Sequence, residues 1–322
     1  MKNKKQTMVS PLDEQIAVYG CGAIGSSEAT LIIGHGLPCT VIGHSQRGLE
    51  RCRGAMAQHW DDLIAEGLAS ERNKEAALDL LTLTNEPAAL AGCTFVFEAV
   101  TEDTKIKQEA YRHIETYAAA DAVIASTTSS LDADVLAGLT GRPQQLLVAH
   151  PFQPVHMLPL VEVVRCGATA EETLARALAV LKTLHRQVVQ LQRSVPGFIV
   201  NRFAQALFRE SLYLIEEGVT TAAEIDRAVK YAVGMRYASI GLLEYFDDVG
   251  FDLEKSIAEN VYPDLCDVKE PQQLVRDGLA SGRTGKAAGQ GLYDWSRIDQ
   301  DDYRRRRQSP YFDTVREWTM PE

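Results

Sequence analysis

The feature that most constrains the fold is a glycine-rich segment, GCGAIG, directly after the short apolar run Gln15–Tyr19. In a turn from a strand to a helix, the first glycine permits the tight bend and the second lets the backbone approach a pyrophosphate. The third lets the helix pack closely on the strand, and the helix N-terminus faces the diphosphate. The motif therefore predicts a dinucleotide site, with a ligand-free glycine-rich turn as the alternative. The predicted cofactor-binding residues of this segment are Gly20, Gly22, Ala23, Ile24 and Gly25.

The pattern downstream predicts the fold class, because short apolar runs alternate with longer amphipathic segments. Such alternation is typical of a doubly wound, mainly parallel sheet of the Rossmann type, covered by helices on both faces. The predicted strands are residues 15–19, 38–42, 81–84, 94–98, 122–125, 146–149, 161–164 and 187–191, and the predicted helices include 49–67, 105–117 and 170–185.

The chain changes character near residue 193, after which the sequence is helical in pattern. We predict a long helix that opens at Pro196 and Gly197, runs to Glu217 and ends at Gly218. The fold class is therefore α/β followed by an all-α C-terminal domain. The predicted division is a flexible tail (residues 1–13), a dinucleotide-binding domain (14–193) and a helical domain for substrate and dimerisation (194–322).

Composition excludes several other classes of protein. The chain has 33 Lys plus Arg against 44 Asp plus Glu, and its net charge of −11 disfavours nucleic-acid or anionic-membrane partners. No apolar run approaches the roughly 20 residues that span a bilayer, and a secretory signal is not evident. None of the six cysteines forms a CxxC pair, so we expect free thiols, no metal and a cytoplasmic location. The Arg304–Arg307 run follows two aspartates and indicates a solvated or interface-pairing tail.

The end of the second predicted strand indicates which dinucleotide is bound. NAD-preferring folds place an acidic residue there to bind the ribose hydroxyls, but this chain has Gly43, His44, Ser45 and Arg47. A ribose 2′-phosphate would be attracted by Arg47 and hydrogen-bonded by His44 and Ser45. We therefore predict a preference for NADP, with NAD as the alternative cofactor. The competing interpretation is an ordinary exposed polar turn.

Two residues of neighbouring predicted strands suggest proton transfer. His150 ends one strand, and Glu162 lies inside the apolar segment 160–164. A carboxylate in so apolar a strand needs a partner, because an unpaired buried charge is costly. Pairing with His150 would satisfy it, fix the imidazole tautomer and raise its basicity, as a general base requires. A purely structural buried pair is the alternative.

Two further polar groups lie where a substrate oxygen could be bound. Ser129 belongs to the Ser/Thr-rich segment 126–130 at a strand end, where ligands of such sheets bind, although these residues also cap helices. Asn201 is a polar residue in the apolar start of the long helix. It could donate to a substrate carbonyl or bond to the loop that packs on it.

Together the motifs resemble one family over nearly the whole chain, the L-3-hydroxyacyl-CoA dehydrogenase superfamily. The motifs, in the family's order, are GCGAIG, FEAVTEDTKIK, ASTTSSL, AHPFQPVHMLPLVEVV and PGFIVNR. Within the superfamily, AHPFQP, PLVEVV and GMRYA are most similar to the branch that acts on small free hydroxy acids. That branch includes L-gulonate 3-dehydrogenase, the lambda-crystallin relative, and L-carnitine dehydrogenase. The segment GRTGKAAGQGLYDW resembles the acyl-CoA branch instead.

The resemblance implies a role for each matching residue. His150 would be the general base, oriented by Glu162, while Ser129 and Asn201 would hold the substrate oxygen. Glu102 and Lys107 would lie by the nicotinamide ribose. The matching motifs thus carry both the catalytic and the cofactor-binding residues. The implied reaction is reversible hydride transfer between C3 of a 3-hydroxy compound and the nicotinamide, in a homodimer.

The chain departs from the family pattern at several positions. Thr127 stands where Asn or Ser is usual, Gln153 where Asn is usual, and Leu242 where Pro is common. The first two substitutions keep hydrogen-bonding capacity but change its reach. The missing acid of the second strand contrasts with the family's usual use of NAD.

The substrate is indicated by the hairpin that follows the second strand, where acyl-CoA enzymes carry basic residues for the CoA phosphates. In this chain the acids of residues 49–81 are not outnumbered by bases, so a small or unactivated 3-hydroxy or 3-oxo acid is favoured over a thioester. A substrate carboxylate could meet Arg202, Arg236 or Lys286.

Two alternatives to the leading hypothesis remain open from the sequence. One is an NAD-dependent L-3-hydroxyacyl-CoA dehydrogenase, and the other is a non-catalytic dinucleotide-binding structural or sensor protein. The retained His150, Glu162, Ser129 and Asn201 argue against the second alternative. A related family with a lysine base is disfavoured because Asn201 occupies the start of the long helix.

Overall fold

The computed structural model describes the backbone of residues 13–319, so the predicted tail lies almost entirely outside the described residues. The chain forms two compact units. The first comprises the residues up to Ile199 together with those from Arg304 onward, and the second comprises Val200–Tyr303. The predicted boundary near 193 lies close to the observed one, but the C-terminal residues group with the first unit instead of the helical domain.

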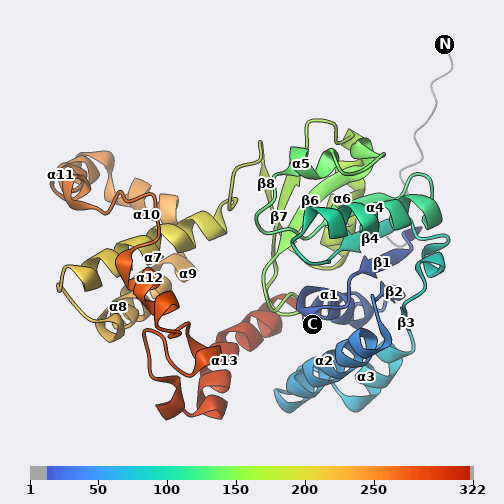
Figure 1. The fold of residues 1–322 in the computed structure, drawn as a ribbon, viewed down its shortest axis with the longest axis horizontal. Helices are drawn as coiled ribbons and strands as arrows, with labels where there is room; N and C mark the ends of the chain where they lie inside the picture. Colours follow the sequence, from blue (N-terminus) through green and yellow to red (C-terminus); the bar gives the residue numbers. More distant parts are fainter. Residues whose placement is uncertain (1–12, 320–322) are drawn as a thin grey trace. The chain divides into compact units, whose positions relative to one another are not determined.

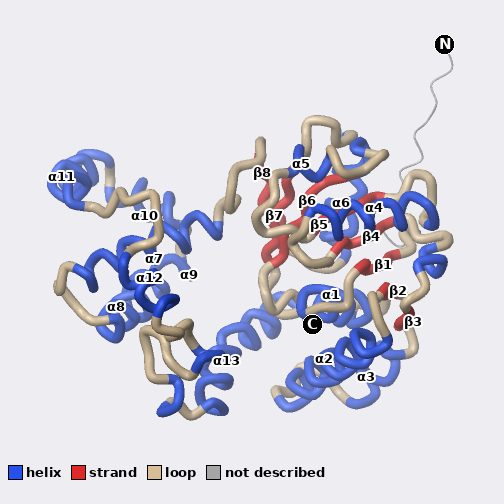
Figure 2. Tube along the Cα trace, viewed as in Figure 1, coloured by secondary structure: helices blue, strands red, loops and turns tan. Residues whose placement is uncertain are grey.

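The first unit is built on an eight-stranded sheet (Figures 1 and 2). The strand order is β3-β2-β1-β4-β5-β6-β7-β8, and all neighbours pair in parallel except β6 and β7. This is the predicted mainly parallel, doubly wound sheet. Its strands are β1 (Ile16–Tyr19), β2 (Cys39–Ile42), β3 (Leu81–Thr84), β4 (Phe95–Glu98), β5 (Val123–Ser126), β6 (Leu146–Pro151), β7 (Leu160–Arg165) and β8 (Gln187–Leu191).

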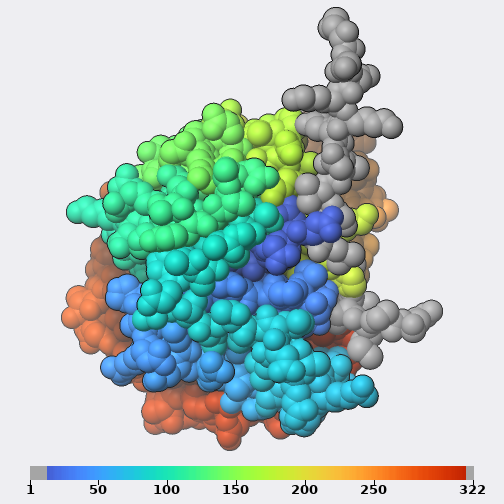
Figure 3. Space-filling view, turned by 90° about the vertical axis from the view of Figure 1, so that its right-hand side faces the viewer, coloured from blue at the N-terminus to red at the C-terminus, as the bar shows by residue number. Residues whose placement is uncertain are grey.

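Alternation along the strands divides the core into two layers. In β1, Ile16 and Val18 face one layer and Ala17 the other, since successive side chains of a strand point to opposite faces. The first layer packs on α1 (Ala23–Gly34), α2 (Gln46–Ala65), α3 (Glu71–Leu78) and α6 (Glu171–Thr183). The second packs on α4 (Thr104–Tyr117) and α5 (Ala133–Ala137). In Figure 3 the blue to cyan segments before β4 adjoin the teal to green segments that follow it.

The second unit is helical, and its first helix begins later than predicted. Helix α7 spans Val200–Glu216 because Gly197 and Phe198 have positive φ angles of 77° and 48°, which no helix tolerates. The predicted end is confirmed, since Gly218 has a φ of 67°. The other helices are α8 (Ala222–Ala228), which continues through a π-helical turn (Val229–Gly234) into α9 (Met235–Ser239), then α10 (Leu242–Val249), α11 (Phe251–Val261) and α12 (Gln273–Ala280).

The last helix, α13 (Gln300–Thr319), explains why the C-terminal residues join the first unit. Phe312 and Val315 are buried in a small cluster with Met157, and Arg316 lies 3.1 Å from a carboxylate oxygen of Glu66 on α2. These contacts are between residues more than 150 positions apart, so no local pattern could reveal them. The Arg304–Arg307 run forms part of α13 and is exposed in this chain.

The core under α1 contains an acid with an unusual environment. Glu28 is 2% exposed, and burial raises the pKa of its carboxyl to about 7, although the nearby positive charge of Arg186 opposes the shift. Arg186 itself is held by the backbone oxygens of Val155, Leu158 and Leu184. Burial also lowers the pKa of His156, to about 3. Glu28 therefore makes the protein less stable as pH rises, and His156 makes it less stable as pH falls.

We predict that Glu28→Gln stabilises the protein more at pH 8 than at pH 5. Folding favours the protonated carboxyl, so its contribution is complete below the unfolded-state pKa of 4.5 and is lost as pH rises through about 7. The gain at pH 8 amounts to at most roughly 3 kcal/mol. Urea denaturation at both pH values measures it, with the exposed Glu50→Gln as control. An equal effect of Glu28→Gln on the free energy of unfolding at both pH values would contradict the raised pKa of Glu28.

Candidate active site

The glycine-rich turn lies where the strand order reverses, because β1 pairs with β2 on one side and β4 on the other. A Cβ atom at Gly20 would lie 2.3 Å from the carbonyl oxygen of Ala99, and one at Gly25 would lie 1.9 Å from that of Gly20. At Gly22, by contrast, a Cβ would meet no atom of the described chain within 4 Å. The first and third glycines are thus required by packing, whereas the second leaves space open.

That open space fits a diphosphate. Gly22 is the N-cap of α1 and offers no side-chain cap, and the first helical turn contains no acidic residue. The backbone N–H groups at Ala23, Ile24 and Gly25 are therefore suited to bind an anion, aided by the positive end of the helix dipole. The residues present fit a dinucleotide in the predicted position.

A cavity of about 370 Å³ opens beside this turn. Inside it, the Tyr19 hydroxyl lies 2.5 Å from Nδ1 of His113. Burial and the neighbouring Glu109 raise the pKa of Tyr19 to about 12, so the phenol keeps its proton and can donate it to the imidazole. His113 and Glu109, both on α4, were not predicted as site residues, because no motif in the sequence around them indicates such a role. The cavity is lined by Tyr19, Gly20, Cys21, Gly22, Ile42, Gly43, His44, Asn85, Pro87, Ala99, Val100, Thr101, Ile106, Glu109, Ala110 and His113.

The end of β2 is tightly packed at the position where an acid is missing. Gly43 is buried, and a Cβ there would lie 2.5 Å from a methyl carbon of Leu49. His44, predicted to contact the cofactor, lines the cavity. Ser45 instead caps α2, accepting a hydrogen bond from the Gly48 N–H at 3.2 Å. Arg47 is exposed and is not among the residues that line the cavity.

A buried ion pair holds the segment that follows β4. Lys107 is 1% exposed, and its ammonium donates to both oxygens of Glu98 at 2.9 and 3.0 Å. Glu98 also accepts hydrogen bonds from Tyr111 at 3.0 Å and Ser126 at 2.7 Å. Lys107 was predicted beside the nicotinamide ribose; the structure places it within this buried network. Glu98 was not predicted, since its position at a strand end is the only local feature that marks it.

Glu102 links that network to the predicted substrate loop. Its second oxygen lies 3.3 Å from Lys107 Nζ, and its first accepts hydrogen bonds from the Thr128 hydroxyl, the Ser129 N–H and the Ser130 N–H and hydroxyl. Burial alone would raise the pKa of Glu102, but these hydrogen bonds and Lys107 outweigh it and lower the pKa. An ionised Glu102 thus fixes the backbone of Ser129.

The predicted His–Glu pair is present and buried. His150 and Glu162 are register partners on the antiparallel strands β6 and β7, which places His150 Nδ1 2.9 Å from Glu162 Oε2. The other carboxylate oxygen accepts a hydrogen bond from the Ile199 N–H at 2.8 Å. Because Nδ1–H donates to the carboxylate, Nε2 is the ring nitrogen suited to exchange a proton with a substrate. The rings of Phe152 and Phe198 contact the imidazole at centroid distances of 4.6 and 5.4 Å.

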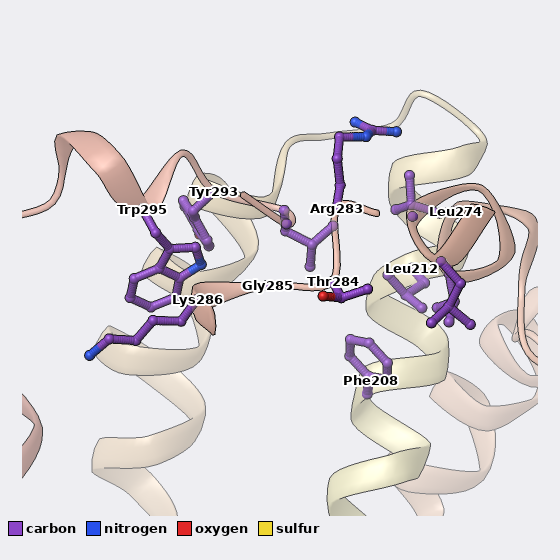
Figure 4. A pocket seen from close by; sticks show the side chains of 14 residues that line it. Phe208, Leu212, Leu274, Arg283, Thr284, Gly285, Lys286, Tyr293 and Trp295 are labelled. Carbon is purple, nitrogen blue, oxygen red and sulfur yellow. The ribbon is translucent and has the colours of Figure 1, made fainter. Parts of the chain in front are cut away.

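The remaining predicted site residue, Asn201, lies in the first turn of α7 and belongs to the helical unit. That unit contains its own apolar pocket of about 370 Å³, lined mainly by α7, α12 and the segment 283–295 (Figure 4). At its edge, the Lys286 ammonium lies over the rings of Trp295 and Tyr303.

Neither a metal centre nor a membrane span is found in the described part of the chain. No group of three or more His, Cys, Asp or Glu side chains there could hold a metal ion. No helix between residues 13 and 319 is both long and apolar enough to cross a membrane.

Comparison with known proteins matches both units. A family model for the 3-hydroxyacyl-CoA dehydrogenase NAD-binding domain matches residues 15–194, and a model for the C-terminal domain of the same family matches 197–295. The chain is 34% identical over 228 residues to L-carnitine dehydrogenase of Staphylococcus epidermidis, covering 70% of each protein. It is 32% identical over 289 residues to 3-hydroxybutyryl-CoA dehydrogenase of Mycobacterium tuberculosis, covering 88% of this chain and 98% of that protein.

A solved structure is similar over nearly its full length. The structure of 5-formyl-3-hydroxy-2-methylpyridine 4-carboxylic acid 5-dehydrogenase, described as an NAD⁺-dependent dismutase, aligns with a TM-score of 0.86 at 26% identity. The alignment covers 95% of this chain and 99% of that one.

The fold, the glycine-rich turn at residues 20–25 (the glycine cradle) and the matched family domains define an oxidoreductase that uses a nicotinamide dinucleotide. The chain belongs to the 3-hydroxyacyl-CoA dehydrogenase family. The resemblance of its motifs to this family is thereby confirmed, and the relatives named L-carnitine dehydrogenase support the predicted branch.

We predict that Gly22→Ala and Gly25→Ala have different effects. The new methyl group at position 22 meets no protein atom but occupies space needed by the diphosphate, so the protein stays folded while the dissociation constant for a dinucleotide rises about tenfold or more. At position 25 the methyl group clashes with the backbone of Gly20, so the melting temperature falls more than in Gly22→Ala. Thermal melts and fluorescence titrations with NADPH and NADH separate the two effects. If Gly22→Ala binds both dinucleotides as tightly as the wild type, the diphosphate does not occupy the space beside Gly22.

Proposed function

We propose that this protein transfers a hydride between NADP(H) and C3 of a 3-hydroxy or 3-oxo acid or its thioester, with His150 and Glu162 as proton relay. The observation that carries the proposal is the buried pair itself, with Nδ1 bound to Glu162 at 2.9 Å. A relay needs one imidazole nitrogen fixed and the other able to exchange a proton, and this arrangement supplies that condition.

The chain's own residues have separate roles in the proposed reaction. The nicotinamide, when bound, supplies the hydride chemistry. In oxidation, His150 Nε2 removes the hydroxyl proton of the substrate, and Glu162 stabilises the resulting imidazolium. In reduction, the protonated His150 returns the proton to the forming hydroxyl. Ser129, whose backbone is fixed by Glu102, and Asn201 hold the substrate oxygen.

The proposed substrate is a small 3-hydroxy or 3-oxo acid. Among the basic residues of the α2–α3 hairpin, Lys74 is already paired with Asp61 at 2.5 Å and lies 3.9 Å from Glu71. This pairing leaves less positive charge for the phosphates of CoA, in contrast to what a CoA thioester would require. The relative named L-carnitine dehydrogenase supports a free hydroxy acid, while the one named 3-hydroxybutyryl-CoA dehydrogenase supports the thioester alternative.

The proposed preference for NADP has support from the missing acid at Gly43, where any side chain would require Leu49 and Cys21 to shift. Arg47, in the first turn of α2, is the cation proposed to meet the 2′-phosphate. The alternative is an NAD-dependent 3-hydroxyacyl-CoA dehydrogenase. It is favoured by the similar solved structure, which is that of an NAD⁺-dependent enzyme.

We expect Arg47→Asp to weaken NADPH binding by about 10- to 100-fold and to change NADH binding by less than about threefold. The range corresponds to the loss of one charge-assisted hydrogen bond or ion pair to the 2′-phosphate. Titration of the protein fluorescence with each dinucleotide measures both constants. Arg53→Asp, an exposed residue of the same helix, controls for the general change of charge. Similar losses for both dinucleotides in Arg47→Asp would exclude its proposed role.

We expect His150→Gln to lower kcat by about 10²- to 10⁴-fold, the usual contribution of a general base, with dinucleotide affinity within about threefold of wild type. Steady-state assays over a panel of 3-hydroxy acids and 3-oxo acids measure turnover. His35→Gln, at a half-buried histidine bonded to Leu31, is the control. Retained turnover in His150→Gln would refute the relay. Binding without turnover in the wild type would support the non-catalytic alternative instead.

We further propose that the protein is a homodimer formed through its helical unit. Several large apolar side chains of that unit are exposed in the single chain, among them Tyr231, Leu243 and Phe251 at 74%, 81% and 76%. Exposed apolar side chains at these positions are what a subunit interface would cover, and the proposal is that they belong to one. The apolar pocket beside Phe208 and Leu212 adds to it (Figure 4). A second copy of this chain is the proposed occupant.

A further inference from the structure

The turn that leaves the first unit has an unusual backbone. Gly197 and Phe198 are consecutive residues in the left-handed region, with φ angles of 77° and 48°. Glycine adopts this conformation readily, but a bulky residue such as phenylalanine is a genuine outlier there. Such outliers persist only where the surrounding structure over-determines them, and they cluster at functional sites.

The Phe198 side chain is fixed on the inner side of this turn. It is 1% exposed and belongs to the core layer that contains Leu136 and Val164. Its ring lies 5.4 Å from the imidazole of His150, tilted by 53°. The ring therefore keeps water from part of the imidazole surface.

The backbone after Phe198 contacts the other member of the pair. The N–H of Ile199 donates to Glu162 Oε1 at 2.8 Å, while Oε2 of the same carboxylate accepts from His150 at 2.9 Å. Glu162 is 1% exposed, so a donor lost here is not readily replaced by water. The left-handed turn at Phe198 thus delivers the hydrogen bond that fixes the carboxylate, and its ring packs on the base.

We propose that Phe198 is a positioning residue that holds His150 in its Nδ1–H tautomer, through its ring on the imidazole and through its backbone, which places Ile199 N–H on Glu162. The inference rests on the proposed relay and deepens it. Phe152 also contacts the imidazole, but the residue whose N–H donates to Glu162 is Ile199, which directly follows Phe198.

The test compares Phe198→Gly and Phe198→Leu with a matched control. Glycine keeps the left-handed backbone accessible but removes the ring, and leucine keeps apolar volume. Phe95→Leu removes an equally buried ring from β4, in the other core layer. For each variant the ¹⁵N signals of selectively labelled histidines report the His150 tautomer, with His150→Gln used to assign the signal. Thermal melts, dinucleotide titrations and steady-state kinetics complete the set.

We expect both Phe198 variants to gain Nε2–H tautomer, because the ring that packs on the imidazole is removed or reshaped. In Phe198→Gly, kcat falls about tenfold, with dinucleotide affinity within about twofold of wild type. Phe198→Leu shows a smaller change in the same direction and serves if the glycine variant does not fold. Phe95→Leu loses stability without altering the tautomer or kcat.

Two results would overturn the inference: an unchanged tautomer in both Phe198 variants, or the same change in Phe95→Leu. These outcomes are distinct from failure of the proposed function. If His150→Gln retains turnover, the relay is wrong, whereas the nitrogen signals still report on Phe198 without any need for activity.

Discussion

The arrangement of the site depends on one buried ion pair, between Glu98 at the end of β4 and Lys107 on α4. Removing two charges from water is expensive and is offset only when the remaining hydrogen-bonding capacity is satisfied. Here Tyr111 and Ser126 donate to the carboxylate, and Lys107 reaches on to Glu102. The pair therefore fixes the segments after β4 and β5 together. Without Lys107, Glu102, which anchors the loop of Ser129, would lack its cation.

The sheet contains a second buried carboxylate, Glu162. Glu98 and Glu162 have different partners, and this difference bears on the proton relay proposed for Glu162 and His150. Glu98 is paired with a lysine and with hydroxyls, none of which titrates near neutral pH when unperturbed. Glu162 is paired with an imidazole, the side chain whose charge changes most readily in that range. Burial thus gives both acids rigid partners, but of the two pairs it is the one with His150 that suits the proposed proton relay.

Local patterns were sufficient to predict much of this molecule. The strands, the glycine cradle and the pairing of His150 with Glu162 follow from hydrophobic alternation, from a motif between strand and helix, and from the cost of an unpaired acid in an apolar strand. The contacts of Lys107 were not predicted, nor was the return of α13 to the first unit. These depend on which distant side chains meet, and a sequence pattern contains no direct record of that.

The start of α7 is a second feature that local sequence patterns failed to predict. Proline is common at the first position of a helix, yet the structure uses the Gly197 and Phe198 that follow it for a left-handed turn. The local preference of phenylalanine opposes that conformation, and what outweighs it is tertiary: burial of the ring and the bond from Ile199 to Glu162. Phe198 departs from its own preference because Gly197, Phe198 and Ile199 form the exit from the first unit and also contact the His150–Glu162 pair.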